Sequence, residues 1–299
     1  MKQKNELTLY LAFAFGLAWI CQVSGCIALW QGNAVFYQVA LMVTMFCPLA
    51  AVLAVTRLFG HRPTGVKWRP KFRGRLRFWL AAWFGPAMFA VLGAALYFLI
   101  FPSRFDTSGS YLAMTMGEAA MEQLAQQGIT PVTYALIAAV QSVTYAPLVN
   151  MLFAMGEEVG WRGFMLPLLK ERFGLWRARL LGGVIWGVWH WPIMLLVGYE
   201  YGTHYLGAPV LGLAVFCVVC FTWSTLLDLL YEKTDCIWVP AIGHGAINAT
   251  AGIATAFLRP EDAYYSVLGP MPMGLIAILP ALALAIWLTW KEAKQASAK

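Results

Sequence analysis

A few ionisable and amide side chains stand inside long apolar stretches of this sequence. Such a side chain is costly in lipid unless it is paired or hydrated, so each one is a candidate for a functional site. The set consists of Glu157, Glu158, Arg162, His190, Asp228, His244 and Asn248. It contains the groups that hydrolysis of a peptide bond requires, namely a base for water, donors for the oxyanion and a proton source for the leaving amine.

The spacing within this set predicts which side chains share a helix face. Glu158 and Arg162 are four residues apart and can therefore form a charge-assisted pair on one face of a helix. His244 and Asn248 have the same spacing, so both side chains can point to one place in a helix bundle. The spacing thus predicts two local pairs, each on its own helix.

The chemistry divides the candidates by role. We expect Glu157 to act as base and then acid on the attacking water, and His190 to orient that water. His244 and Asn248 are expected to supply the donors of an oxyanion hole. Three further residues are expected to position these four without reacting themselves. They are Glu158, Arg162 and Trp186, which precedes His190 by one helical turn.

The composition places these residues in a membrane protein. Of the 299 residues, 61% are hydrophobic and only 12% are charged, whereas roughly a quarter of the residues of a soluble domain are charged. The apolar residues also form long blocks, as a lipid-facing bundle requires. We therefore expect one integral membrane domain over residues 1–299, without a soluble module.

Eight apolar blocks are long enough to cross a bilayer, at about 20 residues each. They are residues 7–30, 34–58, 78–101, 131–156, 180–197, 208–230, 237–258 and 271–290. The predicted fold is an all-α polytopic membrane bundle of about eight transmembrane helices. The fourth helix is expected to continue through Leu169, and residues 117–127 resemble a short amphipathic helix at the outer surface.

The distribution of basic residues predicts the orientation. With the N-terminus in the cytoplasm, all but three of the 21 lysines and arginines fall on the inner side; the three are Arg104, Arg162 and Arg259. This asymmetry predicts that both termini are cytoplasmic. The net charge of +7 is then a signal of topology, and no nucleic-acid partner is expected. The expected location is a bacterial cell membrane.

Counting along the predicted helices gives the depth of the candidate site. From the inner ends of their helices, His190 lies about 15 Å, His244 about 10 Å and Glu157 about 18 Å along the axis. The three counts agree on the cytoplasmic half of the membrane. One convergent site is therefore expected there.

Three motifs in residues 140–255 resemble those of the CPBP family of intramembrane proteases, also called the CAAX-protease and bacteriocin-processing, or Abi, family. Glu157–Arg162 resembles its E-E-x-x-x-R motif, Trp186–His190 its motif of an aromatic residue followed by x-x-x-H, and His244–Asn248 its H-x-x-x-N motif. Trp186 stands where many members carry Phe, which is expected to change the bulk beside His190 and not the chemistry.

The resemblance implies cleavage of a peptide bond near the membrane surface, in a substrate that carries a lipid in some members. Eukaryotic members remove a C-terminal tripeptide from prenylated proteins, and bacterial relatives are linked to bacteriocin maturation, self-immunity and peptide signalling. The expected partners are thus the lipid bilayer and a peptide or protein substrate. The oligomeric state and the biological process are left open.

The sequence leaves open whether the peptidase uses a metal. Glu157, His190 and His244 form a reasonable zinc set, although the H-E-x-x-H arrangement of many zinc peptidases is absent. The amide of Asn248 is a poor zinc ligand and a good oxyanion donor. We therefore favour a glutamate-type endopeptidase without a cofactor, with zinc as the alternative.

Two other functions compete with the peptidase. A non-catalytic scaffold or immunity protein of the same fold would carry the same motifs. A small-solute transporter would also bury ionisable residues, but would usually show repeat symmetry or broken helices in both halves of the chain. Here the candidate polar residues are confined to the second half. Asp228, His204 and His61 are expected to be interfacial or loop residues without a role in any of these functions.

Overall fold

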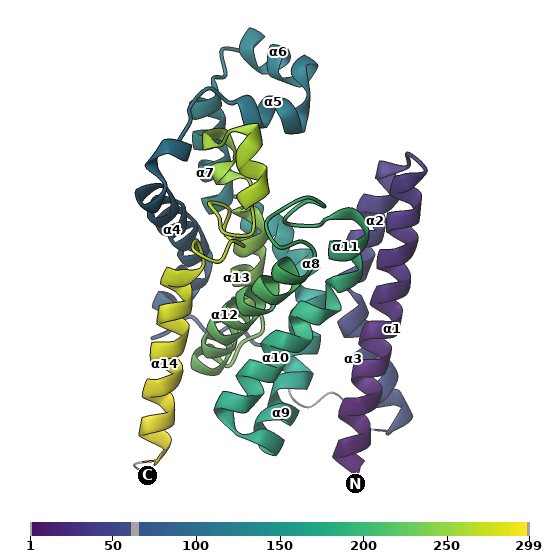
Figure 1. Cartoon of the computed structure of the whole chain (residues 1–299). Coiled ribbons are helices and arrows are strands. Elements are labelled where there is room, and N and C mark those ends of the chain that lie inside the picture. Colours follow the sequence, from purple (N-terminus) through teal and green to yellow (C-terminus); the bar gives the residue numbers. More distant parts are fainter. Residues whose placement is uncertain (1, 61–65, 298–299) are drawn as a thin grey trace.

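The computed structural model describes residues 2–60 and 66–297, with side chains for 5–60 and 66–295, and its regular elements there are all helices (Figure 1). His61 and Arg62 lie outside the described residues. The α-helices are α1 Lys2–Trp30, α2 Ala34–Thr44, α3 Cys47–Leu58, α4 Leu76–Ile100, α5 Ser110–Met116, α6 Glu118–Gln126, α7 Pro131–Val143, α8 Ala146–Gly160, α9 Leu166–Phe173, α10 Leu175–Trp189, α11 Trp191–Val197, α12 Val210–Thr234, α13 Trp238–Ala249 and α14 Leu279–Ser297. The predicted all-α class is confirmed.

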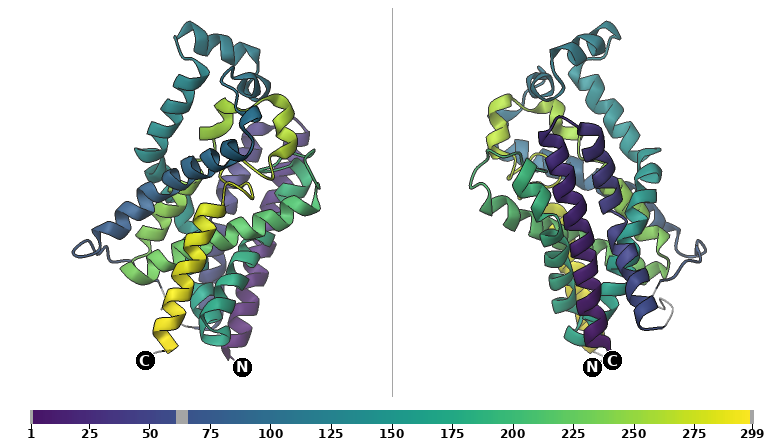
Figure 2. Two further views of the ribbon diagram at one scale, coloured as in Figure 1. Left: turned by 60° about the vertical axis from the view of Figure 1, so that its left-hand side comes forward. Right: turned by 90° about the vertical axis from the view of Figure 1, so that its right-hand side faces the viewer.

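The chain is an integral multi-pass membrane protein by the length and composition of these helices. Among the described residues, four helical stretches are long and apolar enough to cross a membrane, and two bent helix pairs, α2 with α3 and α7 with α8–α9, raise the number to as many as six. Helix α1 begins and α14 ends at the same end of the bundle (Figures 1 and 2). The count of eight crossings and the cytoplasmic placement of both termini stay predictions.

Three predicted spans, 34–58, 131–156 and 180–197, are each divided into two helices in the structure, and two others end or begin at different residues. Helix α13 ends at Ala249, well before residue 258, because the Thr250 hydroxyl donates to the Ile247 carbonyl and Gly252 follows. Helix α14 begins at Leu279, because Pro270, Pro272 and Gly274 break the preceding apolar stretch. Apolar composition alone overestimated both helices.

The fourth predicted span does continue beyond residue 156. Helix α8 passes into a π-helical segment, Trp161–Met165, and then into α9, which ends at Phe173. A π-helical turn widens the helix and shifts the face that the following residues present. The outer amphipathic helix is also present as α6, and it lies with α5 at the end of the molecule opposite the beginning of α1 (Figure 1).

Close packing brings the three motif-bearing helices together. Gly245 of α13 faces the backbone of α8, where a Cβ atom would lie 2.4 Å from the Pro147 carbonyl oxygen. Gly183 of α10 faces α12, where a Cβ atom would lie 2.3 Å from the Cα atom of Phe221. Small residues that allow close approach of helix backbones are typical of membrane interfaces. They hold α8, α10, α12 and α13 in one block.

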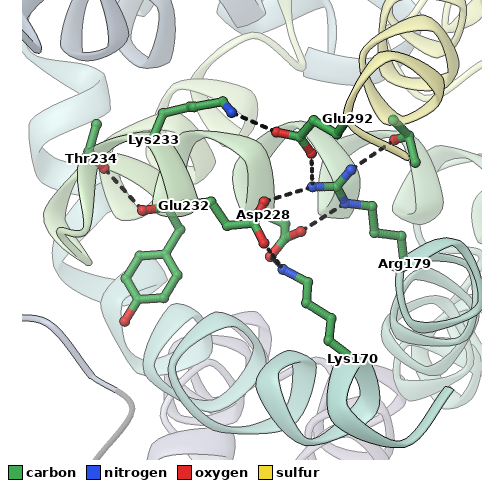
Figure 3. Close-up of polar contacts among 9 residues, drawn as sticks. Lys170, Arg179, Asp228, Glu232, Lys233, Thr234 and Glu292 are labelled. Atoms are coloured by element: carbon green, nitrogen blue, oxygen red, sulfur yellow. Dashed lines mark hydrogen bonds and ion pairs between the residues drawn. The ribbon is translucent and has the colours of Figure 1, made fainter. Parts of the chain in front are cut away.

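An ion-pair network joins α9, α10, α12 and α14 near the end where α1 begins (Figure 3). Arg179 is fully buried and donates to Asp228 at 2.8 Å, Glu232 at 3.0 Å and Glu292 at 2.9 Å. Lys170 also pairs with Asp228, at 2.5 Å. Asp228, expected at the interface, is thus buried in this network, whereas His204 lies exposed in the loop between α11 and α12, as expected.

Candidate active site

The Glu157 carboxylate is held by two tryptophans. Its side chain is buried, and its Oε2 atom accepts a hydrogen bond from the indole N–H of Trp161 at 3.0 Å and from that of Trp186 at 2.7 Å. Trp161 follows Glu157 by four residues at the start of the π-helical segment, and Trp186 comes from α10. Both donors meet the same oxygen, so Oε1 is the carboxylate oxygen that no described residue engages.

Glu158 points to a different set of partners. Its Oε1 atom accepts hydrogen bonds from Nη1 of Arg162 at 2.9 Å and from Nδ1 of His244 at 2.8 Å. Glu158 and Arg162 are fully buried, and His244 nearly so. The Glu158–Arg162 pair that the spacing predicted is therefore present. Its link to His244, 86 residues away, comes from the packing of α13 on α8.

His190 lies at the junction of α10 and α11 and is half-buried. Its Nδ1 atom lies 2.9 Å from the Trp186 carbonyl oxygen. Since a carbonyl only accepts, Nδ1 must carry the proton, and a neutral ring then presents Nε2 as an acceptor. Tyr199 stacks parallel to the ring at a centroid distance of 6.4 Å. His190 is thus fixed in its tautomer and orientation.

Trp186 is the common neighbour of these groups. Besides its hydrogen bond to Glu157, its ring centroid lies 5.1 Å from that of His244 and 6.2 Å from that of His190. The Arg162 guanidinium carbon lies 4.7 Å from the centre of a Trp186 ring. The expectation that this tryptophan changes only the bulk beside His190 was wrong, because a phenylalanine could not donate to Glu157.

Asn248 lies apart from this cluster in the structure. It is on α13, one turn after His244, but its side chain is exposed and has no hydrogen-bond partner among the described residues. The expected role of the amide as an oxyanion donor stays a prediction. Of the four candidates for chemistry, the structure gathers Glu157, His190 and His244 around Trp186.

Several buried polar atoms of the cluster have no partner within the described part of the chain. They are Oε2 of Glu158, Nε and Nη2 of Arg162, and the hydroxyl of Tyr10, a residue of α1 that packs on the cluster. Buried polar groups are nearly always hydrogen-bonded in proteins, to protein atoms or to ordered water. A hydrogen-bond partner other than the described side chains is therefore expected at these buried atoms.

Two aromatic residues of the cluster were missed by the sequence analysis. Trp161 stands four residues after Glu157, and this spacing was the available signal, because it is the spacing that predicted the Glu158–Arg162 pair. Tyr10 of α1 is fully buried and packs edge-on against Trp161 at a centroid distance of 6.0 Å. No local signal linked α1 to the site.

The zinc alternative needs Glu157, His190 and His244 to converge on one ion. Within the described ranges, no three His, Cys, Asp or Glu side chains are placed so that they could hold a metal ion. As arranged here, the set does not form a metal site, and we derive no step through a metal.

The region that carries the candidate site is similar to known proteins. A family model described as type II CAAX prenyl endopeptidase Rce1-like matches residues 132–250, which include every candidate site residue. The curated protein CAAX prenyl protease 2 of Methanococcus maripaludis is 35% identical over 63 residues. That alignment covers 20% of this chain and 23% of the relative, so it spans less than a quarter of the relative's length.

Proposed function

We propose that this chain, a member of the CPBP family of intramembrane proteases, hydrolyses a peptide bond of a membrane-associated protein or peptide with water activated by Glu157. The observation that carries the proposal is that Oε2 of Glu157 accepts hydrogen bonds from two indole N–H groups. Because Trp161 and Trp186 both donate to Oε2, the carboxylate is held in place while Oε1 stays available to accept a proton. A fixed carboxylate with one open oxygen is what a general base requires.

In the proposed reaction, Oε1 of Glu157 takes a proton from water as the water oxygen attacks the carbonyl carbon of the substrate. Nε2 of His190 accepts a hydrogen bond from the second O–H of the same water and so orients it. The carbon–nitrogen bond then breaks, and Glu157 passes its proton to the leaving amine. The carboxylate is thereby regenerated, and no covalent intermediate forms on the enzyme.

His244 and Asn248 are the proposed donors to the oxyanion. If both histidines are neutral, the carboxylates of Glu157 and Glu158 and the guanidinium of Arg162 give the cluster a net charge of minus one. A proton on His244 would cancel that charge, and it would turn Nε2 into a donor while Nδ1 stays bonded to Glu158. Asn248, exposed one turn further along α13, would meet the substrate from the open side. The support for this assignment is the 2.8 Å contact between His244 and Glu158.

The proposed substrate is a peptide that reaches the site from the membrane, and a lipidated C-terminal segment is the first candidate. The name of the Methanococcus relative describes a prenyl protease, and the Rce1-like region contains all the proposed groups. We also propose, from the distribution of basic residues, that the site lies in the cytoplasmic half of the membrane. The glutamate-type mechanism is preferred to a metal-dependent one.

The experiment is incubation of purified protein with a prenylated C-terminal peptide and with an unmodified membrane peptide, with and without a chelator. We expect mass spectrometry to find one cleavage product with wild type in both conditions. Glu157→Gln should form none, and Glu122→Gln, which changes an exposed carboxylate on α6, should cleave like wild type. Cleavage by Glu157→Gln at the wild-type rate would refute the role of Glu157, and loss of activity with chelator would favour a metal.

A further inference from the structure

An apolar groove of about 650 Å³ opens on the side of the bundle between α4, α12, α13 and α14. None of the residues proposed for catalysis lines it. Its charged and amide side chains are Lys233, Lys291, Glu292 and Gln295, which come from the ends of α12 and α14, and the Trp223 indole N–H is a further polar group in the lining. The volume lies within the range of about 300–1,000 Å³ that is usual for small-molecule sites.

The groove is a wedge between two diverging helices. Gly93 of α4 packs directly on Ala277, just before α14, where a Cβ atom on the glycine would lie 2.1 Å from the Ala277 carbonyl oxygen. From this crossing the two helices separate toward the end where α14 ends (Figure 2, left). The lining is therefore apolar toward Phe89 and Leu284, on the side of the crossing, and its lysines lie toward the ends of α12 and α14.

The wide end of the wedge carries positive charge. Lys291 lines the groove and is exposed, with its ammonium 5.3 Å from the centre of the Trp287 ring. Arg77 lies beside the groove, with its guanidinium 4.8 Å from the centre of the ring of Phe78, which is a lining residue. Neither cation forms an ion pair with an acidic residue in the described part of the chain, whereas Lys233 is paired with Glu292 at 2.8 Å. Trp287 is also exposed, and exposed tryptophans beside lysines are typical of the headgroup level of a membrane.

We propose that this groove binds an anionic glycerophospholipid, with an acyl chain in the wedge and the headgroup against Arg77 and Lys291. The shape and the charge agree, because the apolar part tapers away from the cationic mouth as a lipid chain extends away from its headgroup. A peptide substrate fits less well, since the Trp223 indole is the one side-chain hydrogen-bonding group that the described residues place in the apolar part of the wedge, and a peptide backbone has many polar groups to satisfy. The inference is independent of the proposed catalytic activity.

The test is lipid binding by delipidated full-length protein, measured by native mass spectrometry with phosphatidylglycerol and phosphatidylcholine of identical chains. Gly85 lines the groove, and a Cβ atom there would meet nothing within 4 Å. Gly85→Phe should therefore fill the wedge and weaken phosphatidylglycerol binding at least tenfold. Gly16→Phe is the matched control, because Gly16 is a helical glycine of α1 with the same open surroundings, and it should bind like wild type.

The headgroup is tested by Arg77→Gln and Lys291→Gln, which leave the wedge intact. Each should reduce the preference for phosphatidylglycerol over phosphatidylcholine about fivefold, as expected for one cation near an anionic headgroup. An unchanged preference in both variants would overturn the proposal, and so would equal loss of binding in the two glycine variants. Displacement of the phospholipid by an equal concentration of a prenylated peptide would assign the groove to substrate and would also overturn it.

Discussion

The indole N–H of Trp186 lies 2.7 Å from Oε2 of Glu157, the same oxygen that Trp161 engages at 3.0 Å. Two neutral donors on one oxygen fix the carboxylate plane and distinguish the two oxygens. Hydrogen bonds to a charged group contribute roughly 1.5–3 kcal/mol each. The position of the proposed base thus depends on a residue of a different helix, 29 positions along the chain.

Trp186→Phe tests this dependence, because it keeps an aromatic ring and removes the donor. We expect kcat for peptide cleavage to fall by about 10-fold to 100-fold, the equivalent of one hydrogen bond to a charged group. The matched control is Trp83→Phe, since the Trp83 indole donates to the Val143 carbonyl at 3.0 Å, away from the site. A kcat of Trp186→Phe equal to that of the control would show that the contact does not position Glu157.

Arg162→Met should destabilise the folded protein strongly. It leaves the Glu158 carboxylate fully buried without its guanidinium, and breaking a buried pair in this way costs about 3–5 kcal/mol. The double variant Glu158→Leu with Arg162→Met should recover part of the loss. Lys71→Met breaks the more exposed pair with Asp235 and should cost less than about 1 kcal/mol. Thermal unfolding in detergent ranks the three variants, and equal midpoints would contradict the expectation.

Glu200 should make stability depend on pH near neutrality. It lies in the loop between α11 and α12, outside the apolar spans, and burial raises its pKa to about 7 from 4.5. A carboxyl with a raised folded pKa contributes stability that is full below its unfolded pKa and is lost as pH rises through the folded pKa. We therefore expect stability to decline between about pH 4.5 and 7, by at most about 3 kcal/mol.

The measurement for Glu200 is the thermal unfolding midpoint at a series of pH values. Glu200→Gln should flatten this part of the profile, while Glu261→Gln, an exposed carboxylate on the segment Pro260–Tyr265, should leave it unchanged. The same slope in Glu200→Gln as in wild type would exclude Glu200 as its source.

Gly245→Ala should weaken the packing of α13 on α8. The new methyl group would lie 2.4 Å from the Pro147 carbonyl oxygen and 2.6 Å from the Met151 nitrogen, so one of the two backbones must move. Overpacking of this kind costs about 1–3 kcal/mol. Activity should fall as well, because the contact between His244 and Glu158 crosses this interface. Gly16→Ala meets nothing and should be neutral, and equal unfolding midpoints for the two variants would contradict the packing argument.

The sequence predicted one of the two pairs that helical spacing indicated, since His244 is buried whereas Asn248 is exposed. The Glu158–Arg162 pair follows from helical spacing alone, and it is present at 2.9 Å. The partners of Glu157 and His244 depend on how α8, α10 and α13 pack. Adjacent carboxylates point about 100° apart on a helix, but only the packing shows that Glu158 faces His244 and Glu157 faces Trp186.

The helices were likewise predicted only in part from the sequence. Apolar blocks predicted single continuous helices in α1 and α12. The blocks 34–58 and 131–156 are instead bent pairs of helices. Apolar blocks also failed after Ala249 and before Leu279, where hydroxyl, glycine and proline residues end the helix although the composition stays apolar. The buried position of Arg179 was also invisible, since an arginine at a helix end usually indicates topology.

The central claim, that Glu157 activates water directly, is tested by a single turnover of peptide cleavage in water enriched in oxygen-18. Direct attack of water places one heavy oxygen in the new carboxyl group of the product during the first turnover and leaves Glu157 unlabelled. A covalent attack by Glu157 would release the amine and form a mixed anhydride, and attack of water on the Glu157 carbonyl of that anhydride would give first-turnover product with an ordinary oxygen and leave the label on the Glu157 side chain. Mass spectrometry of the product and of the enzyme peptide that contains Glu157 distinguishes the two, and label on Glu157 would contradict the account.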